Sequence, residues 1–382
     1  TYITLSNWLN LYRNLYWQAS SSFEKNDIRR EIGNLANKIY IATNITKLTP
    51  VTSENIKLRK PGPLRLIFLS RISPKKNLDF LLRVLSKINT PVELAIYGPK
   101  GDTGYWKRCL NLKKKLPSNI KVLVGDVVPG KKVLKVFGQH DLFVFPTLGE
   151  NFGHAIAESL TAGTPVLVSD QTPWGSAWGS SNKGGVEILP LNEDKWIKAI
   201  KRWSNFNHKL LIKKRQGALK YISNYNVNNV ALKQNRELFN LVLNNNNRKT
   251  ILCFVEYYLP GNKGGGPVRS IANLVETFGD KFDIKIICAN HDDSDIKPYK
   301  NIKSNSWNTV GKAQVFYASP ESTNFKGIKK ILNETPYDLL YLNSFFSFKF
   351  TIIPLLLRKL GLVSKKPPCI IAPRGEFSLE AV

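Results

Sequence analysis

The sequence predicts an α/β protein of two domains from its length, its hydrophobic content and its alternation of strand-like and helix-like segments. The chain has 382 residues, enough for two domains at about 150 residues each. Its hydrophobic fraction of 42% is typical of a chain that buries a core. From Leu64 onward, short apolar runs alternate with helical patterns, which is typical of parallel sheets built from strand–helix–strand units.

Two series of alternating segments predict two sheets. In the first series, apolar residues recur with the period of a helix over 78–88. The strands expected around this helix are 66–70, 93–97, 121–124, 142–145 and 165–169. The second series follows the Asn run at 244–247, which is typical of a surface turn or linker. Its expected elements are a helix at 267–278 and strands at 250–255, 283–289, 338–342 and 369–372.

The first 48 residues have the pattern of the missing remainder of the second series. We expect a helix around Trp8 and strands at 16–19 and 39–42. Between the strands, Ser21 and Glu24 have the spacing of a capping box, which predicts the start of a helix. We infer a circularly permuted order, which is tolerated where cut and joined ends lie on the surface. Thr1 and Val382 are then expected on the same domain, within a short loop's reach.

This order predicts the domain boundaries. Residues 1–48 and 249–382 are expected to form one domain, and residues 49–215 the other. Residues 216–248 are expected to form a C-terminal helix and the Asn-rich linker.

The charge of the chain favours anionic partners. Lys and Arg number 56 against 28 Asp and Glu, which gives a net charge of +28 and a pI near 9.9. Nucleic acid, an anionic membrane surface and phosphorylated small molecules all fit such a field. A basic surface that serves solubility is the alternative, because charge runs are usually solvated faces.

The cysteines and histidines predict a reduced, cytoplasmic setting without a metal site. All eight are dispersed, without the spacings of a zinc site or a redox pair. The most apolar stretch, 345–363, is interrupted by Lys349, Pro354, Arg358 and Lys359, so it cannot span a bilayer. We expect it to be a buried helix, with an interfacial helix as the alternative.

The segment 141–170 carries the most informative pattern, a strand, a polar turn, a helix and another strand. The turn 149–153 comes at the carboxyl end of a strand and the amino end of a helix, where free N–H groups and the helix dipole attract a diphosphate. Glu150 can accept hydrogen bonds from sugar hydroxyls, and Glu158 from a ribose diol. The alternatives are a helix-start acid for Glu150 and a solvated position for Glu158.

A second loop, 68–77, carries two cations, and it also connects the carboxyl end of a strand to the amino end of a helix. Arg71 follows a strand, and Lys76 comes just before a helix. Fixed cations suit a departing diphosphate, because preorganised groups stabilise charge that develops in the transition state. A basic surface loop is the alternative.

Three elements together resemble glycosyltransferase family 4. They are Gly-Glu-Asn-Phe-Gly-His-Ala-Ile-Ala-Glu at 149–158, Arg-Ile-Ser-Pro-Lys-Lys-Asn at 71–77 and Ser-Asp-Gln-Thr-Pro-Trp at 169–174. The resemblance implies the GT-B fold, in which two Rossmann-like domains face each other across a cleft. It also implies a retaining transfer from a nucleotide-diphosphate-sugar to an acceptor hydroxyl, of hexosyltransferase type, with no metal or other cofactor. Surface polysaccharide or lipid-linked glycan synthesis in bacteria is the expected pathway.

The resemblance assigns roles to residues of both domains. Arg71 and Lys76 would hold the phosphates, Glu150 the donor sugar and Glu158 the ribose, with the amides of Asn151, Phe152 and Gly153 facing sugar and phosphate. In rotated order, 257–269, 373–377 and 17–24 are similar to parts of the acceptor domain. The substrate-binding residues expected there are Gly265, Gly266, Arg269, Arg374 and Glu376. A flexible turn is the alternative for the glycines, and a structural ion pair for Arg374 with Glu376.

The chain departs from the family pattern at one position, and two other motifs lack features of the sites they resemble. Where many members have a histidine, this chain has Asn343-Ser344 and 373–375, so no histidine role is carried over. The P-loop-like run 125–132 ends in Lys132, which offers magnesium no oxygen. The acidic run 291–295 lacks the pattern of a calcium loop and predicts a solvated loop.

The expected partners are a nucleotide-sugar and a glycan or lipid-linked glycan acceptor. Lys349, Arg358, Lys359, Lys365 and Lys366 predict peripheral association with the inner face of an anionic membrane. The alternative function is a basic nucleic-acid-binding protein without transferase activity. The chain lacks the sequence signatures of the common nucleic-acid-binding modules, so no nucleic-acid partner is expected.

Overall fold

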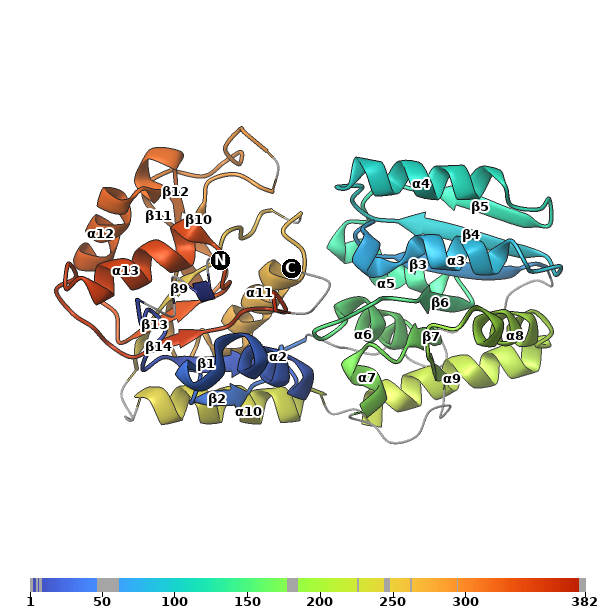
Figure 1. Cartoon of the computed structure of the whole chain (residues 1–382), viewed down its shortest axis with the longest axis horizontal. Helices are drawn as coiled ribbons and strands as arrows, with labels where there is room; N and C mark the ends of the chain where they lie inside the picture. Colours follow the sequence, from blue (N-terminus) through green and yellow to red (C-terminus); the bar gives the residue numbers. More distant parts are fainter. Residues whose placement is uncertain are drawn as a thin grey trace. The chain divides into compact units, whose positions relative to one another are not determined.

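The computed structural model divides into two compact units, each an α/β domain (Figure 1). Unit 1 comprises Thr1–Lys47 and Val227–Val382, and unit 2 comprises Leu48–Asn226. The structure describes residues 3–4, 6, 9–46, 62–176, 185–224, 227–243, 248–261, 263–293 and 295–377. The predictions for Trp8, for the Asn run 244–247 and for both termini lie outside these residues. The predicted α/β class with two Rossmann-like domains is confirmed.

Unit 2 is built on a parallel sheet of six strands. In spatial order the strands are β5 (Ile120–Val124), β4 (Val92–Tyr97), β3 (Leu64–Leu69), β6 (Leu142–Phe145), β7 (Val166–Ser169) and β8 (Val186–Leu189). β6 and β7 are buried at every position, as continuous apolar runs in a parallel sheet should be. The five strands expected from the first series are present, with ends that differ by at most two residues.

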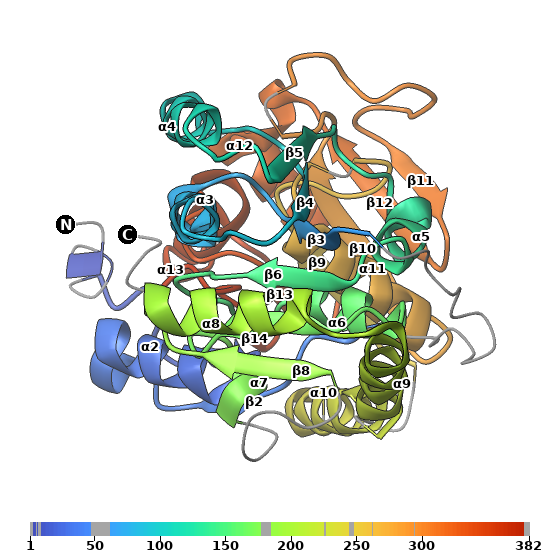
Figure 2. The ribbon, with the colours of Figure 1, turned by 90° about the vertical axis from the view of Figure 1, so that its right-hand side faces the viewer.

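The helices of unit 2 lie against this sheet (Figures 1 and 2). They are α3 (Leu78–Leu85), α4 (Thr103–Lys114), α5 (Val133–Gly138), α6 (His154–Thr161), α7 (Pro173–Ser176), α8 (Glu193–Ser204) and α9 (His208–Asn224). α3 packs against α4 and α8, and α6 packs against α5 and α9. Polar side chains cap the start of three of them: Asp102 accepts from the amide of Tyr105, Asn192 from that of Lys195 and Asn207 from that of Leu210.

Unit 1 is built on an eight-stranded sheet, parallel except for one hairpin. Its spatial order is β11 (Trp307–Val310), β12 (Ala313–Ala318), β10 (Asp283–Ala289), β9 (Thr250–Phe254), β13 (Leu339–Leu342), β14 (Cys369–Ile371), β1 (Tyr16–Ala19) and β2 (Ile39–Ile41). β1 pairs with β14 in the register Tyr16 with Ile370, so chain segments at opposite ends of the sequence share the sheet. The antiparallel pair β11–β12, which turns at Gly311, was not predicted from the sequence.

Helices cover both faces of the unit 1 sheet and form two buried cores. On one face lie α2 (Ser22–Ile32), α12 (Phe325–Glu334) and α13 (Ile353–Lys359). On the other lie α10 (Val227–Leu243) and α11 (Gly266–Phe278). The apolar stretch 345–363 forms a π-helical turn, Phe348–Ile352, and α13, and much of it is buried, as expected.

One predicted boundary is wrong. Residues 216–248 were expected to be a single C-terminal helix with a linker, but they span most of α9 and all of α10, which belong to different units. α10 packs through Leu238 and Phe239 into a core of unit 1. The apolar faces of both helices are continuous with helical periodicity, so the sequence pattern alone did not show which sheet each helix covers.

The four cysteines are free and buried. In the described part of the chain, no helix combines the length and the apolar character needed to cross a membrane.

Candidate functional site

The strand order of unit 2 reverses between β3 and β6. From β3 the chain proceeds through β4 and β5 toward one edge of the sheet, and from β6 through β7 and β8 toward the other. All of these strands are parallel, so their carboxyl ends lie together. In open α/β sheets, ligands bind outside the carboxyl ends of the strands at such a reversal. The loops after β3 and β6 are the two that carry the predicted cations and acids.

The two loops meet in a direct ion pair. Lys76 Nζ lies 2.5 Å from Glu150 Oε1, and each side chain is less than one-fifth exposed. Lys76 Nζ also lies 5.5 Å from the centre of the Phe145 ring, at the end of β6. Two residues that the sequence separates by 74 positions are therefore held together at the strand reversal.

Local backbone geometry places Lys76 for this contact. Pro74, Lys75 and Lys76 form a single 3₁₀ turn after the extended Ser73. Asn77 then has a φ of +59°, in the left-handed region, and α3 begins at the next residue. Asn is among the few residues other than glycine that adopt this conformation readily.

Backbone hydrogen bonds join the two loops beneath the ion pair. The carbonyl oxygen of Lys75 accepts from the amide of Leu148 at 2.8 Å and lies 3.0 Å from the Thr147 hydroxyl. Ser169, at the end of β7, donates its hydroxyl to the carbonyl of Thr147 at 2.5 Å. The amide of Glu150 donates to the carbonyl of Gln171 at 3.0 Å. The turn that carries Glu150 is thus fixed from both sides.

Gly153 ends this turn and begins α6. Its φ of +81° is left-handed, and a Cβ there would lie 2.9 Å from Ile156 Cδ1 and 3.2 Å from Trp174 Nε1. Trp174 Nε1 donates to the carbonyl of Phe152 at 2.5 Å, so the predicted segment 169–174 buttresses the turn. The amino end of α6 consequently faces the carboxyl edge of the sheet, where its dipole favours an anion.

Arg71 lies at the same edge, in the exposed loop after β3. The loop is fixed by Gly98, which follows β4 with a φ of +141°. A Cβ at Gly98 would lie 1.9 Å from the carbonyl oxygen of Ser70, so only glycine fits. The role of Gly98 was missed from the sequence, although a glycine directly after a strand is a signal of close backbone approach.

Glu158 lies on α6, half-buried, with its Oε2 atom hidden from solvent. Its position one turn into the helix keeps it on the element whose amino end faces the site. Asn151 is half-buried in the turn itself, and Phe152 is buried against the rings of His154 and Trp174. All seven site residues predicted for unit 2 therefore lie on the loops and helix that follow β3 and β6.

In unit 1, the predicted glycines lie at the start of α11. Gly265 has a φ of +70° and a ψ of −134°, a conformation that is strained for other residues. Gly266 is the first residue of the helix, and Arg269 lies in its first turn, half-buried. This end of α11 follows β9, at the carboxyl edge of the unit 1 sheet.

Arg374 and Glu376 do not form the ion pair that was considered for them. Arg374, with a φ of +59°, donates to the side chains of Asn343, Asn44 and Tyr341. Glu376 accepts from the Ser344 hydroxyl at 2.7 Å and from the amides of Phe345 and Phe346. Burial raises the pKa of Glu376, and the backbone and hydroxyl donors partly offset that effect. Each side chain is tied into unit 1 by its own partners.

Glu24 has a role that the capping box did not predict. Its amide donates to Ser21 Oγ, as expected, but its carboxylate does not return to the amide of Ser21. Instead it accepts from the amide and hydroxyl of Ser20 and from the amide of Gly375 at 2.6 Å. The first segment of the chain therefore holds the turn that carries Arg374.

The acidic run at 291–295 is not simply a solvated loop, which corrects that prediction. Asp292 is buried and accepts from the amides of Lys263 and Asp293. A Cβ at Gly261 would lie 2.8 Å from Asp292 Oδ1, so this carboxylate packs under the glycine-rich loop. No group of acids, histidines and cysteines within the described ranges has the arrangement of a metal site.

Comparison with known proteins supports a glycosyltransferase. Residues 52–219 match the family described as glycosyl transferases group 1. Over 147 residues the chain is 26% identical to D-inositol 3-phosphate glycosyltransferase of Rhodococcus erythropolis, covering 37% of this chain and 33% of that protein. It is 30% identical over 106 residues to an uncharacterized glycosyltransferase of Methanocaldococcus jannaschii, covering 27% of this chain and 26% of that protein. The chain therefore matches about a third of the length of these relatives or less.

Among solved structures, the fold is similar to that of Anabaena HepE in complex with UDP-glucose. The TM-score is 0.50 at 18% identity, over 62% of this chain and 65% of that chain. At this identity the similarity bears on the fold, and it supports the GT-B architecture of two Rossmann-like domains.

Proposed function

Starting from the match of residues 52–219 to the group 1 glycosyl transferases, we propose that the chain transfers a sugar from a nucleotide-diphosphate-sugar to an acceptor hydroxyl. The observation that carries this proposal is the contact of Lys76 with Glu150 at the strand reversal of unit 2. It sets a cation for a phosphate beside a carboxylate for a sugar. The complex of HepE with UDP-glucose is consistent with a donor of this class.

The diphosphate is held by Arg71, Lys76 and the amino end of α6. Lys76 keeps Glu150 as its counter-ion, while Arg71 is exposed toward solvent at the same edge. Both cations and the helix dipole oppose the negative charge that grows on the diphosphate as it departs. Positive groups that are already fixed need not reorganise during the reaction, which is the origin of their catalytic effect.

Glu150 binds the transferred sugar of the donor, and Glu158 binds its ribose. In the described part of the chain, the hydrogen bonds to the Glu150 carboxylate use only Oε1, so Oε2 remains available to a donor-sugar hydroxyl. Glu158, one turn along α6, accepts hydrogen bonds from the ribose diol. A carboxylate cannot donate to a diphosphate and repels its charge, so hydroxyl groups of the donor are the partners that suit these two acids.

The transfer retains the configuration of the sugar, as the family 4 resemblance implies. The bond between the anomeric carbon and the diphosphate oxygen breaks, and its electron pair leaves with the nucleotide diphosphate. The acceptor oxygen bonds to the anomeric carbon on the same face and gives its proton to a departing phosphate oxygen. The reaction requires no metal, because Arg71, Lys76 and α6 supply the positive charge. A hexose is the proposed sugar.

Unit 1 is the acceptor-side domain in this proposal, in circularly permuted order. The pairing of β1 with both β14 and β2 supports the order, because strands from residues 1–48 complete a sheet begun by residues 249–382. Gly265, Gly266, Arg269, Arg374 and Glu376 lie at or beside the carboxyl edge of that sheet. The contacts of Arg374 and Glu376 give these two a supporting role in shaping the acceptor loops.

The acceptor is a glycan or lipid-linked glycan of a bacterial surface polysaccharide, handled at the cytoplasmic face of a membrane. The basic residues Lys349, Lys359, Lys365 and Lys366 of unit 1 are exposed, which supports docking on anionic lipid. Arg358 donates to the carbonyl of Pro367 at 2.6 Å and serves the fold as well. Failure to sediment with phosphatidylglycerol vesicles at low salt would exclude this docking.

A nucleotide-sugar screen tests the function. Thermal shift across UDP-, GDP- and ADP-sugars identifies the donor, and release of nucleotide diphosphate measures turnover. Lys76→Ala should lower kcat/KM about 100-fold or more, since removal of one charge-stabilising group costs roughly 3 kcal/mol or more in the transition state. Lys131→Ala, at an exposed lysine of the P-loop-like run, is the matched control and should turn over like the wild type. Equal activity of the two variants would remove Lys76 from the mechanism.

A further inference from the structure

Unit 1 has a strand reversal of its own, between β9 and β13. From β9 the chain runs to β10 and β12 on one side, then crosses back to β13 and β14 on the other, where β1 and β2 from the start of the chain extend the sheet. The amide of Asn343, directly after β13, donates to the carbonyl of Phe254 at the end of β9, at 3.0 Å. The same topological rule that locates the unit 2 site therefore points to the residues that follow β9 and β13.

Glu256, two residues after β9, is the carboxylate at this reversal. Its side chain is exposed, and no described residue donates a hydrogen bond or ion pair to it. Partial desolvation and the negative charge of Asp293 raise the pKa of Glu256, while Lys349 and His291 oppose the rise. A carboxyl group with open acceptor atoms at a strand reversal is suited to bind hydroxyl groups.

The turn after β13 places aromatic rings beside this acid. Glu376 accepts from the amides of Phe345 and Phe346, which fixes the turn, and Ser347 then caps the π-helical turn that follows. Phe346 is 40% exposed and Phe348 is 64% exposed, although the same turn buries Phe345 completely. Exposed rings on a rigid turn are unfavourable in water and mark an interaction site when they cluster with polar groups.

The acid and the rings belong to one locality. β9 and β13 are parallel neighbours in which Phe254 pairs with Leu342, so Glu256 and the turn that begins at Asn343 leave the sheet at the same carboxyl edge, from adjacent strands. In agreement with this placement, the charge of Glu256 acts to raise the pKa of Glu376, which holds that turn.

We propose that Glu256 together with Phe346 and Phe348 forms the subsite of unit 1 that recognises a neutral sugar of the acceptor. This inference rests on the proposed function and adds the chemistry of the acceptor to it. Apolar faces of sugar rings pack on aromatic side chains, while the Glu256 carboxylate accepts from sugar hydroxyls. A phosphate or uronate fits poorly, because no described lysine or arginine pairs with the Glu256 carboxylate to offset its repulsion of a second anion.

Binding to a glycan array tests the subsite directly. The labelled full chain is applied to neutral oligosaccharides of glucose, galactose and N-acetylglucosamine, with phosphorylated and uronate-bearing glycans on the same array. The expected result is binding to neutral oligosaccharides that falls about tenfold in Glu256→Gln and in Phe348→Ala, as loss of a charge-assisted hydrogen bond or a buried ring implies. The matched controls are Glu334→Gln and Phe325→Ala, exposed residues of α12 in the same unit, and these should bind as the wild type does.

The outcomes separate this inference from the proposed function. Donor binding is measured in parallel by thermal shift, and it should be equal in all five proteins. Three results would overturn the subsite. The first is intact donor binding without any signal from neutral oligosaccharides. The others are equal signals from the wild type and both subsite variants, and a preference for phosphorylated glycans. If no protein bound the donor, the proposed transferase function would be wrong. The subsite would then still be tested by the glycan binding of the wild type and its variants.

Discussion

Lys76 and Glu150 meet because each sits on a backbone that has little freedom. Lys76 follows a 3₁₀ turn that the left-handed Asn77 ends, and Glu150 lies in a turn fixed by Thr147 and Ser169. A lysine and a glutamate on mobile surface loops would lose most of their attraction to side-chain entropy and salt. Here the supports come from three strand ends, so the backbone holds the two side chains in place for each other.

Gly98 offers a test of that rigidity without touching a charged residue. In Gly98→Ala, the new Cβ would collide with the carbonyl of Ser70 and the residue would keep a φ that alanine tolerates poorly. We expect the free energy of unfolding to fall by about 2 kcal/mol or more, and donor turnover to fall because the loop of Arg71 shifts. Urea denaturation and nucleotide release measure the two effects.

Gly101→Ala is the control for this substitution. Its Cβ would meet nothing within 4 Å, and its φ is not in the left-handed region. Its stability should stay within about 0.5 kcal/mol of the wild type. Similar losses in both variants would mean that the close approach at Gly98 does not matter.

Residue roles at the site could be predicted from the sequence only where a short motif carries them. The positions of Arg71, Lys76 and Glu150 at strand ends or helix starts, and of Glu158 on the helix that follows, could be predicted because these features are encoded locally. The pairing of Lys76 with Glu150, the use of Glu24 and the separate partners of Arg374 and Glu376 were not predicted. Each depends on contacts between segments that are far apart in sequence, and a short sequence motif does not predict such contacts.

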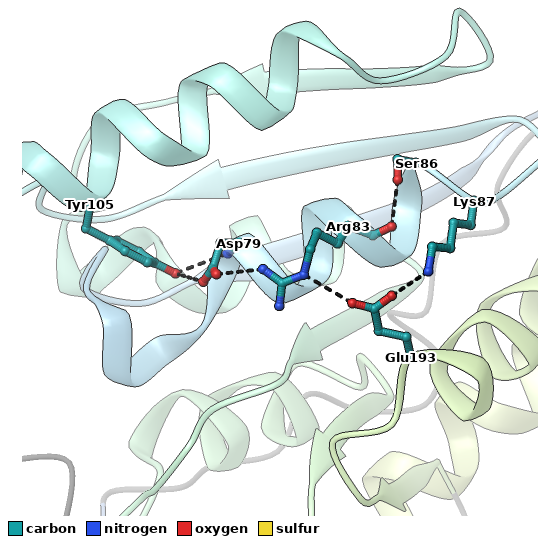
Figure 3. Close-up of polar contacts among 6 residues, drawn as sticks. All are labelled: Asp79, Arg83, Ser86, Lys87, Tyr105 and Glu193. Atoms are coloured by element: carbon teal, nitrogen blue, oxygen red, sulfur yellow. Dashed lines mark hydrogen bonds and ion pairs between the residues drawn. The ribbon is translucent and has the colours of Figure 1, made fainter.

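At the scale of elements, a polar network joins the helices on one face of unit 2 (Figure 3). Arg83 on α3 donates to Asp79 of its own helix at 2.8 Å and to Glu193 of α8 at 3.1 Å. Tyr105 of α4 donates its hydroxyl to Asp79 at 2.5 Å, and Lys87 donates to Glu193 at 2.7 Å. The consecutive helices α3 and α4 are thereby cross-linked with α8, which lies far from them in sequence, over the sheet that carries the site.

This network makes part of the stability depend on pH. Burial acts to raise the pKa of Asp79, but hydrogen bonds from Tyr105 and Arg83 outweigh it and hold the pKa below its usual value. Hydrogen bonds from Lys87 and Arg83 lower the pKa of Glu193. A lowered folded-state pKa gives stability that is present above the unfolded pKa of about 4 and is lost as pH falls through the folded value.

Asp79→Asn should therefore remove both stability and acid sensitivity. At pH 7 we expect a loss of about 1 kcal/mol, the usual worth of a partly exposed charged hydrogen bond. Between pH 5 and about pH 3 the variant should lose less stability than the wild type. Urea denaturation at a series of pH values measures this, and parallel curves for the two proteins would contradict it.

Element boundaries were largely predictable, and pairing was less so. Strand ends such as those of β1, β6 and β10 follow from apolar runs, and Ser21 marks the start of α2. The hairpin β11–β12 was missed because β11, at the edge of the sheet, has no buried position and so gives a weak apolar signal beside the mostly buried β12. The division of 216–248 between units was missed because amphipathic periodicity predicts which face of a helix is buried, but not which sheet that face packs against.

At the scale of the molecule, unit 1 is assembled from distant parts of the chain through a buried polar network. Gln18 on β1 donates to Asn235 of α10 and to the carbonyl of Ala42. It accepts from the hydroxyl of Tyr341 on β13 at 2.6 Å, and Tyr341 in turn accepts from Arg374. Because unpaired polar groups in a core are costly, the network commits these segments to one arrangement.

Asn235→Ala tests whether these segments unfold together. Asn235 donates to the carbonyls of Thr43 and Ala231 at 2.8 Å, and its loss leaves buried groups without partners. We expect faster hydrogen exchange in 16–19, 39–46 and 227–243 together, with strand 64–69 of unit 2 unchanged. Asn240→Ala, at an exposed position of the same helix, is the control. Exchange that rises in 227–243 alone would show that α10 is not coupled to β1 and β2.

A crystal structure with the nucleotide-diphosphate-sugar found by the screen is the most direct test of the site. We expect its diphosphate within hydrogen-bond distance of Lys76 Nζ and the Arg71 guanidinium, at the amino end of α6, with a sugar hydroxyl on Glu150. A diphosphate bound elsewhere, for example on the loop at 125–132, would contradict the account.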